Sequence, residues 1–343
     1  MRNKTKHILL TILLLANGHI ASADPWFTGP LLALAGETMA PGQGSIEIYS
    51  YYTTISNIYD RSWNKIGVPT VVSKQFFPDI SYGLINNVDI EVQPIYVMPQ
   101  NEHATGNNIG DTTVILGFQV LREGNDHAHP NLRLTLQEIF PTGLYDHLDP
   151  KKFGTDASGT GSYQTSLGLN FEHLASLTET HYLDTYLSLT YNYAASVPLN
   201  GLSVYGGNPA TKGRIAPGNS LNIDAAGELS LTQNWVAVME GFFLYQQASS
   251  FTGSFGHPSP SAPVIIDRNH KRRLQRNRIV PTRHNIGGKS GIGGGNSDQF
   301  TLAPAIEYNF SDNYGIIGGV IFTVAGKNTA SYSTATLAFN ASW

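Results

Sequence analysis

Hydrophobic and polar residues alternate along the end of the chain, from Ser331 to Trp343. Counted back from the terminus in steps of two, one set is apolar: Ala335, Leu337, Phe339, Ala341 and Trp343. The intervening positions are small and mostly polar. A strict period of two over this length predicts a β-strand whose two faces meet different solvents. An apolar face that ends on a terminal aromatic is typical of the closing strand of a bacterial outer-membrane barrel, in which the last strand pairs with the first. A strand of a soluble sandwich is the alternative.

The same alternation recurs through most of the chain and predicts about twelve strands. Tight turns and long polar connections follow each other in regular order between them, as in barrels with short periplasmic turns and long outer loops. We therefore expect an all-β fold, a transmembrane antiparallel up-and-down β-barrel. The predicted strands before the last one are Ser45–Thr54, Thr70–Leu84, Val88–Met98, Asp111–Arg122, Asn131–Phe140, Ser162–His173, Tyr182–Ala195, Leu221–Leu231, Trp235–Gln247, Gln299–Phe310 and Tyr314–Ala325.

The first residues have the features of a secretory signal peptide. Three basic residues precede a short apolar stretch, Ile8–Ala16, and Ala21-Ser22-Ala23 forms a cleavage site. The stretch is too short to span a bilayer as a helix. We predict a signal peptide over residues 1–23, a periplasmic or lumenal segment over 24–44, and an outer-membrane barrel over 45–343 with a long outer loop at 248–297.

The segment Asp24–Gly44 does not alternate and is rich in Pro and Gly. Its large apolar residues, Trp26, Phe27, Leu31 and Leu32, need shelter from water. It could lead into the barrel from the periplasm, or fold into the lumen as a plug.

The composition agrees with an exported wall that faces lipid. Charged residues make up 13% of the chain, against about 25% in an ordinary soluble domain. Cysteine is absent, so neither disulfides nor thiolate chemistry are available. No motif calls for a cofactor.

Acidic residues dominate the face that should point inward, and Arg133 is the clearest base among them. One hypothesis is a pore that favours cations or neutral solutes over anions. The alternative is a filled interior in which these acids bind Arg133, tyrosines and a plug. The predicted lumen-facing acids are Asp79, Asp89, Glu91, Glu172, Asp184, Asp224, Glu228, Glu240 and Glu307.

The long outer loop carries a dense cluster of basic residues. On the outer surface such a cluster could bind lipopolysaccharide phosphates or acidic glycans, or it could be a variable loop with no fixed role. Nucleic acid is not an expected partner in that compartment. The cluster comprises Arg268, Lys271, Arg272, Arg273, Arg276, Arg278 and Arg283.

Catalytic and metal-binding motifs are weak. Asp146, Asp149 and Asp156 share one loop but lack the EF-hand spacing. His173 and His181 are candidate bases, yet the chain has no G-x-S-x-G elbow and no H-E-x-x-H helix. We therefore expect neither an enzyme nor a metal site, and an outer-membrane hydrolase is the weakest alternative.

The stretch Gln137–Leu174, with its run PTGLYDHLDPKKFGTDASGTGSYQTSLGLNF, resembles an outer-membrane barrel family named for the meta-pathway of phenol degradation, a transporter-like group. Trp26–Pro41 and Ser297–Phe310 carry further parts of the resemblance, which covers nearly the whole mature chain. The chain departs from the family pattern at Gly256–Gly295. The resemblance implies passage of small aromatic or hydrophobic compounds and supplies no catalytic residue.

These observations together predict an outer-membrane channel for passive or facilitated uptake of small hydrophobic or aromatic solutes. The alternative is a closed barrel that acts as a surface adhesin or a structural protein. The expected partners are outer-membrane lipid, lipopolysaccharide, a small solute, and the barrel-assembly machinery, which would bind the C-terminal strand.

Overall fold

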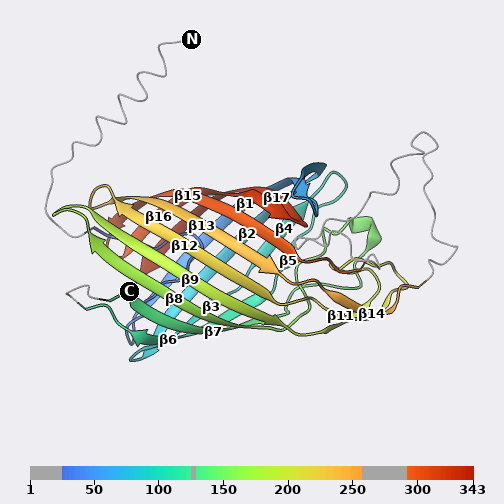
Figure 1. The fold of residues 1–343 in the computed structure, drawn as a ribbon, viewed down its shortest axis with the longest axis horizontal. Coiled ribbons are helices and arrows are strands. Elements are labelled where there is room, and N and C mark those ends of the chain that lie inside the picture. The colour runs from blue at the N-terminus through green and yellow to red at the C-terminus, as the bar shows by residue number, and fades with distance from the viewer. Residues whose placement is uncertain (1–24, 125–128, 257–291) are drawn as a thin grey trace, which may run out of the picture.

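The computed structural model describes residues 25–124, 129–256 and 292–343 (Figure 1). The predicted signal peptide and the basic cluster at residues 268–283 lie outside these ranges. No helix in the described ranges has the length and hydropathy needed to cross a membrane. Besides strands, the structure contains one 3-10 turn, Pro150–Lys152.

Strands account for most of the described residues, as the alternation predicts. Their bounds are β1 Gly44–Tyr59, β2 Lys65–Ile85, β3 Val88–Gln93, β4 Tyr96–Gln100, β5 Asn108–Ile109, β6 Thr112–Leu121, β7 Asn131–Phe140, β8 Gln164–Ser176, β9 Tyr182–Ala194, β10 Val197–Asn200, β11 Lys212–Ala216, β12 Ser220–Ser230, β13 Trp235–Gln246, β14 Ser250–Ser254, β15 Ser297–Ser311, β16 Tyr314–Lys327 and β17 Thr329–Ser342.

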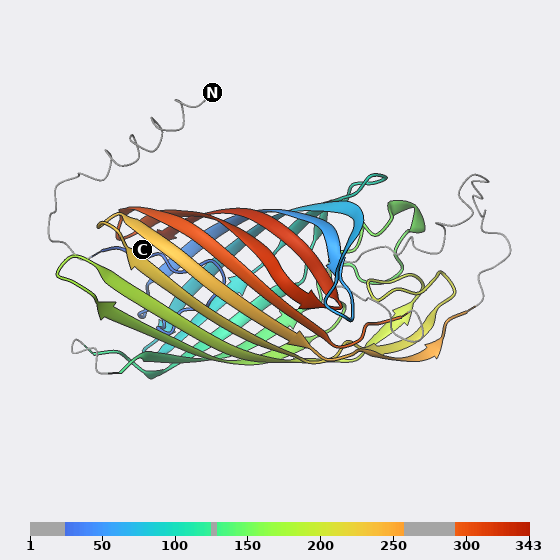
Figure 2. The same cartoon turned by 45° about the horizontal axis from the view of Figure 1, so that its top comes forward.

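The main sheet closes on itself as an antiparallel barrel (Figure 2). Neighbouring strands of the sheet are antiparallel, and the last strand, β17, returns to pair with β1, with Phe339 opposite Ile48. Trp343 and Gly44 extend this pairing through two backbone hydrogen bonds of 2.9 and 3.0 Å. Closure leaves the barrel without an unpaired edge.

Within the described ranges, the fourteen strands of this sheet make twelve crossings of the barrel wall. β3 with β4, and β5 with β6, each form one crossing interrupted by a short irregularity. Pro94, which has no backbone N–H, lies at the first break, and Gly110 donates to the carbonyl of Ile95 at 2.8 Å across the second. The predicted twelve-stranded antiparallel barrel is therefore confirmed.

The outer surface of the wall is apolar and the inner surface is mostly polar. In β17, Leu337 and Phe339 are 53% and 43% exposed on the outside, whereas Thr336 faces inward and is 7% exposed. The same contrast holds on other strands, where Val320, Leu187 and Met239 are also exposed. An apolar outer surface around a polar interior is the pattern of a barrel whose wall contacts lipid.

The two ends of the barrel differ. One end, here called the turn end, carries short connections such as residues 86–87, 231–234 and 312–313 together with the C-terminus. The other, the loop end, carries the long connections at residues 141–163, 195–219 and 247–296.

A second, small sheet lies at the loop end, made of β10, β11 and β14 (Figure 1). It has its own apolar cluster, in which Leu199 and Ile215 are fully buried and Val197 and Tyr205 lie beside them. We call this sheet and its cluster the outer cap. The sequence predicted only polar loops here, because the cluster draws single apolar residues from several loops that do not alternate.

Candidate functional site in the barrel lumen

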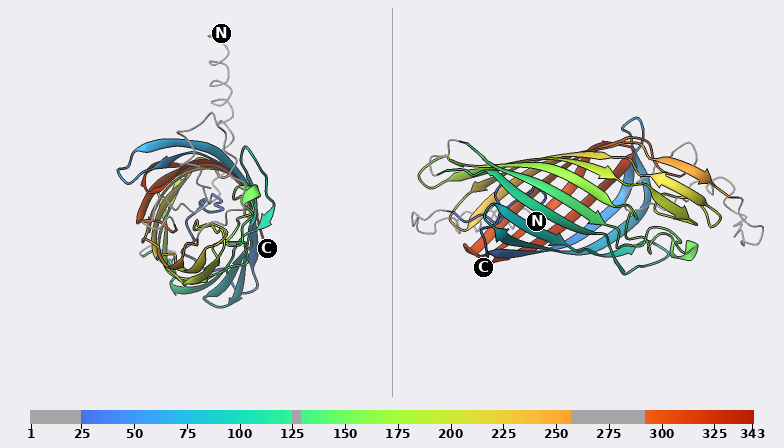
Figure 3. Two further views of the ribbon diagram at one scale, coloured as in Figure 1. Left: turned by 90° about the vertical axis from the view of Figure 1, so that its right-hand side faces the viewer. Right: turned by 90° about the horizontal axis from the view of Figure 1, so that it is seen from below.

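The N-terminal segment, residues 25–43, lies inside the ring of strands. Figure 3 (left) looks along the barrel and shows this segment, in dark blue, within the lumen. It forms no strand of the barrel, so its backbone N–H groups need other acceptors. Side chains of five barrel strands provide them. Glu307 accepts from Thr28 at 2.7 Å, and Glu240 accepts from Leu32 and Ala33 at 3.1 and 2.5 Å. Further along the segment, Glu172 accepts from Gly36 at 2.7 Å, Gln119 accepts from Thr38 at 2.6 Å, and Asp89 accepts from Met39 at 3.1 Å.

Apolar residues of the segment also contact the wall. Leu31 is 3% exposed and packs in a cluster with Tyr49, Val238 and Ile317. Leu32, the next residue, is 36% exposed. Of the apolar residues that the sequence marks as needing shelter, Leu31 is thus the buried one, while Trp26 and Phe27 are partly buried.

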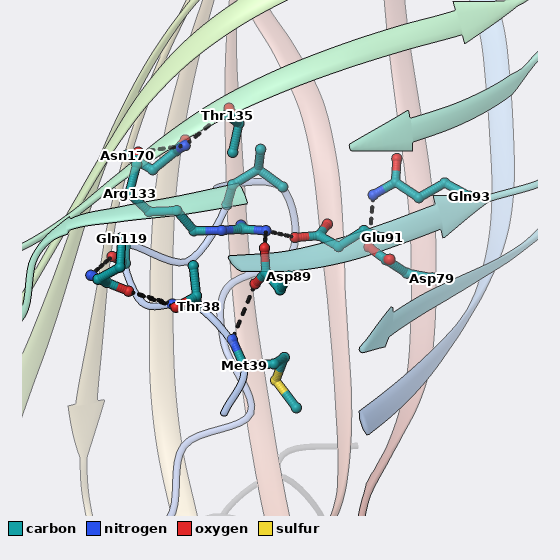
Figure 4. A network of polar contacts seen from close by, with 12 residues as sticks. Thr38, Met39, Asp79, Asp89, Glu91, Gln93, Gln119, Arg133, Thr135 and Asn170 are labelled. Atoms are coloured by element: carbon teal, nitrogen blue, oxygen red, sulfur yellow. Dashed lines mark hydrogen bonds and ion pairs between the residues drawn. The ribbon is translucent and has the colours of Figure 1, made fainter. Parts of the chain in front are cut away.

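Arg133 of β7 is the centre of a buried polar network (Figure 4). Its guanidinium donates to Asp89 at 2.7 Å and also to Glu91, and its side chain is 1% exposed. Asp89 in turn accepts from the N-terminal segment, so one cation is connected to both the wall and the segment. Further hydrogen bonds offset the cost of burying such an ion pair, and here Nε of Arg133 has no hydrogen-bond partner among the described residues.

The other predicted lumen acids also lie inside. Asp79 accepts from Gln93 at 2.8 Å. The hydroxyl of Tyr186 lies 2.8 Å from Asp184 and 3.0 Å from Glu228. Seven of the nine acids are less than 9% exposed; Asp79 and Glu172 are partly exposed. Sequence reasoning missed a tenth, Glu47, which has the same inward parity and lies opposite Asp79.

A cavity of about 930 Å³ occupies the lumen beside the N-terminal segment. Seven aromatic side chains and seven carboxylates line it, and no Lys, Arg or His of the described residues does. Tyr49, Tyr51 and Phe77 stand together on β1 and β2, and polar residues such as Ser188 and Thr190 line another part. The cavity is therefore acidic and aromatic at once.

A smaller cavity of about 290 Å³ lies toward the loop end. The outer cap contributes Val204 and Tyr205 to its lining, and the rest is largely uncharged and polar. Gln75 and Ile95 line both cavities, so these two residues lie where the two spaces are adjacent. In the cap, burial raises the pKa of Tyr145, with the charge of Asp146 as a second cause, so its hydroxyl stays protonated and donates to Pro198 at 3.2 Å.

Other candidate residues from the sequence lie elsewhere. Asp149 and Asp156 form local backbone contacts in the loop of the 3-10 turn, and no group of three or more metal-ligating side chains occurs in the described ranges. His173 pairs with Glu123 at 2.9 Å, and His181 contacts threonine hydroxyls at the turn end. Binding of lipopolysaccharide by the basic cluster, and of the assembly machinery by β17, stay predictions.

Comparisons with known proteins bear on the fold. No family model matches the chain, and no curated protein matches it in sequence. An outer membrane channel from Pseudomonas putida F1 aligns with 92% of this chain and 100% of its own length, at 12% identity and a TM-score of 0.63. The NanC porin aligns with 86% of this chain and 98% of its own (8% identity, TM-score 0.43), and the translocator domain of the autotransporter NalP from Neisseria meningitidis with 88% and 89% (10% identity, TM-score 0.42).

The first of these likenesses shows a shared fold, and the other two TM-scores are too low to add to it. The chain is therefore an outer-membrane β-barrel in its architecture. The named resemblance to the phenol-degradation group stays a prediction, since no family model matches.

Proposed function

We propose that this protein is an outer-membrane channel through which small solutes cross by diffusion. The observation that carries the proposal is the pair of internal cavities, about 290 and 930 Å³, which share Gln75 and Ile95 as lining residues. The smaller cavity lies toward the outer cap, and the larger one lies beside the N-terminal segment. A barrel that served only as a scaffold would have no need for such a space, and side chains could fill it.

The N-terminal segment is the proposed closure of this path at the turn end. Its hydrogen bonds to Glu307, Glu240, Glu172, Gln119 and Asp89 support this role, because they attach the segment to strands all around the lumen. By the rule that periplasmic turns are short, this end faces the periplasm.

The proposed solutes are small and apolar or aromatic. The aromatic side chains of the inner cavity support this assignment, since they offer flat apolar surface to a ring or a short hydrocarbon. Anions are the solutes that we expect to pass least, because carboxylates and no bases among the described residues line the inner cavity.

Deletion of residues 26–39 tests the proposal. Residues 40–44 are kept because Gly42, Gln43 and Gly44 hydrogen-bond to Gly83 and Trp343 at the start of β1. In planar bilayers and in liposome swelling with a series of sugars, amino acids and phenols, the deletion should raise conductance and solute flux. A deletion of the same length within the predicted outer loop, residues 258–271, is the control. An unchanged, near-zero conductance after removal of residues 26–39 would support a closed barrel with a surface or structural role instead.

A further inference from the structure

Two acids face each other directly on the inner wall. Glu47 of β1 and Asp79 of β2 are cross-strand partners in the antiparallel ladder. Like charges in this arrangement destabilise a sheet unless something neutralises them. Neither residue forms an ion pair within the described ranges, and one buried oxygen of each, Oε1 of Glu47 and Oδ1 of Asp79, has no hydrogen-bond partner there. This pair therefore has unused capacity to accept hydrogen bonds from a cation.

Aromatic rings lie immediately beside the two acids. The next inward pair along the same strands is Tyr49 opposite Phe77, whose ring centroids are 5.7 Å apart. Tyr51 stacks on Tyr49, also at 5.7 Å and with an angle of 11° between the planes. Rings next to carboxylates are the surroundings in which proteins bind ammonium groups, because the ring face carries negative potential. We call Glu47, Asp79, Tyr49, Tyr51 and Phe77 the acid–aromatic site.

No protein cation within the described residues is available to neutralise this site. The lining of the 930 Å³ cavity contains no Lys, Arg or His of the described residues. Arg133, the nearest buried base, is bound to Asp89 and Glu91. On the opposite wall, Asp224 also lines the cavity, is only 5% exposed, and has an oxygen, Oδ1, with no hydrogen-bond partner. The charge that the cavity lacks must come from a bound proton or from a cationic ligand.

We propose that the acid–aromatic site binds an organic ammonium ion that carries a small apolar or aromatic group. The ammonium lies between Glu47 and Asp79 and donates to their unpartnered oxygens. Its apolar group packs on Tyr49, Tyr51 and Phe77, next to the apolar cluster that contains Leu31. This inference names a substrate class for the proposed channel and rests on that function for transport, whereas binding itself does not require conduction.

Three probes of nearly equal size separate charge from shape: 2-phenylethylamine, which is cationic at pH 7, neutral 2-phenylethanol, and anionic phenylacetate. Titration calorimetry on the full mature protein in a neutral detergent should show the amine binding about tenfold more tightly than the alcohol, the size of one favourable cation–ring contact. Phenylacetate should bind weakest. Equal affinity for the amine and the alcohol in the wild-type protein would overturn the proposal.

Substitutions then locate the site. The double variant Glu47→Gln, Asp79→Asn should lose the preference for the amine and keep its affinity for the alcohol. Glu138→Gln is the matched control, because Glu138 is an acid of the wall whose side chain contacts Thr165 on the outer face. Tyr51→Leu should lower the affinity for the amine, whereas Tyr51→Phe, which keeps the ring, should leave that affinity unchanged. Folding of every variant is checked by its heat-dependent migration on gels. A double variant that folds and still prefers the amine would refute the assignment.

Liposome swelling with the same three probes distinguishes the two proposals. If the wild type binds the amine but lets none of the probes through, the acid–aromatic site is supported and the proposed channel function is refuted. If all three probes pass at equal rates and bind with equal affinity, the channel function is supported and the acid–aromatic site is refuted.

Discussion

The carboxylate of Glu240 accepts a hydrogen bond of 2.5 Å from the backbone nitrogen of Ala33, a residue 207 positions away in the sequence. The same carboxylate also accepts from Leu32. Glu240 therefore replaces, for one turn of irregular chain, the acceptors that a neighbouring strand would supply. Side chains on four other strands accept hydrogen bonds from the segment in the same way. Attachment of the N-terminal segment is therefore a structural role of these lumenal acids, separate from any effect on a solute.

Loss of Glu240 should loosen the N-terminal segment at its middle. In Glu240→Leu the N–H groups of Leu32 and Ala33 lose their acceptor, which should cost about 1–3 kcal/mol locally. The chain has no cysteine, so Ala33→Cys gives a single thiol whose rate of modification by a water-soluble maleimide reports exposure. The rate should rise in the Glu240→Leu background and not in Glu138→Leu. An equal rate in both would show that this carboxylate does not hold the segment.

Gly83 should accept no side chain, because the N-terminal segment passes directly over it. A Cβ built at Gly83 would lie 2.0 Å from the carbonyl oxygen of Ala40. Gly83→Ala should therefore displace residues 39–41 and lower the free energy of unfolding by about 1–3 kcal/mol. Gly318→Ala is the control, since its nearest contact would be an ordinary 3.6 Å from Leu337. Urea unfolding in lipid vesicles, followed by tryptophan fluorescence, measures both; equal stability losses would contradict this packing.

The strands and closure of the barrel were predictable because each wall strand separates two solvents. Leu337 and Thr336 differ in polarity for that physical reason, and a period of two is visible without any neighbour. The inward parity of acids such as Asp89 and Glu307 follows from the same alternation.

The partners of these acids were not predictable from local pattern. Nothing near Glu240 in the sequence points to Ala33, since the segment that supplies the N–H groups has no period of its own. The inner apolar cluster around Val236, Val238 and Ile317 also weakens the alternation, because Leu31 makes that part of the lumen apolar on its inner face as well.

Arg133 should be required for stability because it neutralises two buried carboxylates. In Arg133→Met, Asp89 and Glu91 remain buried without their cation, and we expect a loss of about 3–5 kcal/mol in the free energy of unfolding. The triple variant Arg133→Met, Asp89→Asn, Glu91→Gln should recover most of this loss. Arg122→Met is the control: its pair with Glu37 is about 40–50% exposed and worth only about 0–1 kcal/mol. If Arg133→Met lowers the free energy of unfolding no more than Arg122→Met does, the buried network around Arg133 is not required for stability.

The outer cap should unfold locally without affecting the barrel. Leu199 is fully buried in the cap cluster, so Leu199→Ala should destabilise the cap by about 2–5 kcal/mol. Limited proteolysis of intact cells should then cut the 195–219 connection faster, while heat-dependent gel migration of the barrel stays unchanged. Leu144→Ala, at a residue of the same end that is 46% exposed, should leave both unchanged. Loss of the folded gel form in Leu199→Ala would show instead that cap and barrel fold as one unit.

Contact between the wall and lipid predicts that the cost of an outward charge depends on depth. Val320 points outward near the middle of β16 and is 47% exposed, whereas Tyr314 points outward at the turn end of the same strand. Val320→Arg should lower the free energy of unfolding in vesicles by about 2–4 kcal/mol, and Tyr314→Arg by about 0–1 kcal/mol, because an arginine near the headgroups keeps its charge in water. Urea titrations in vesicles measure both variants. Equal, small losses at the two positions would mean that the apolar exterior meets water or protein rather than the hydrocarbon core of a bilayer.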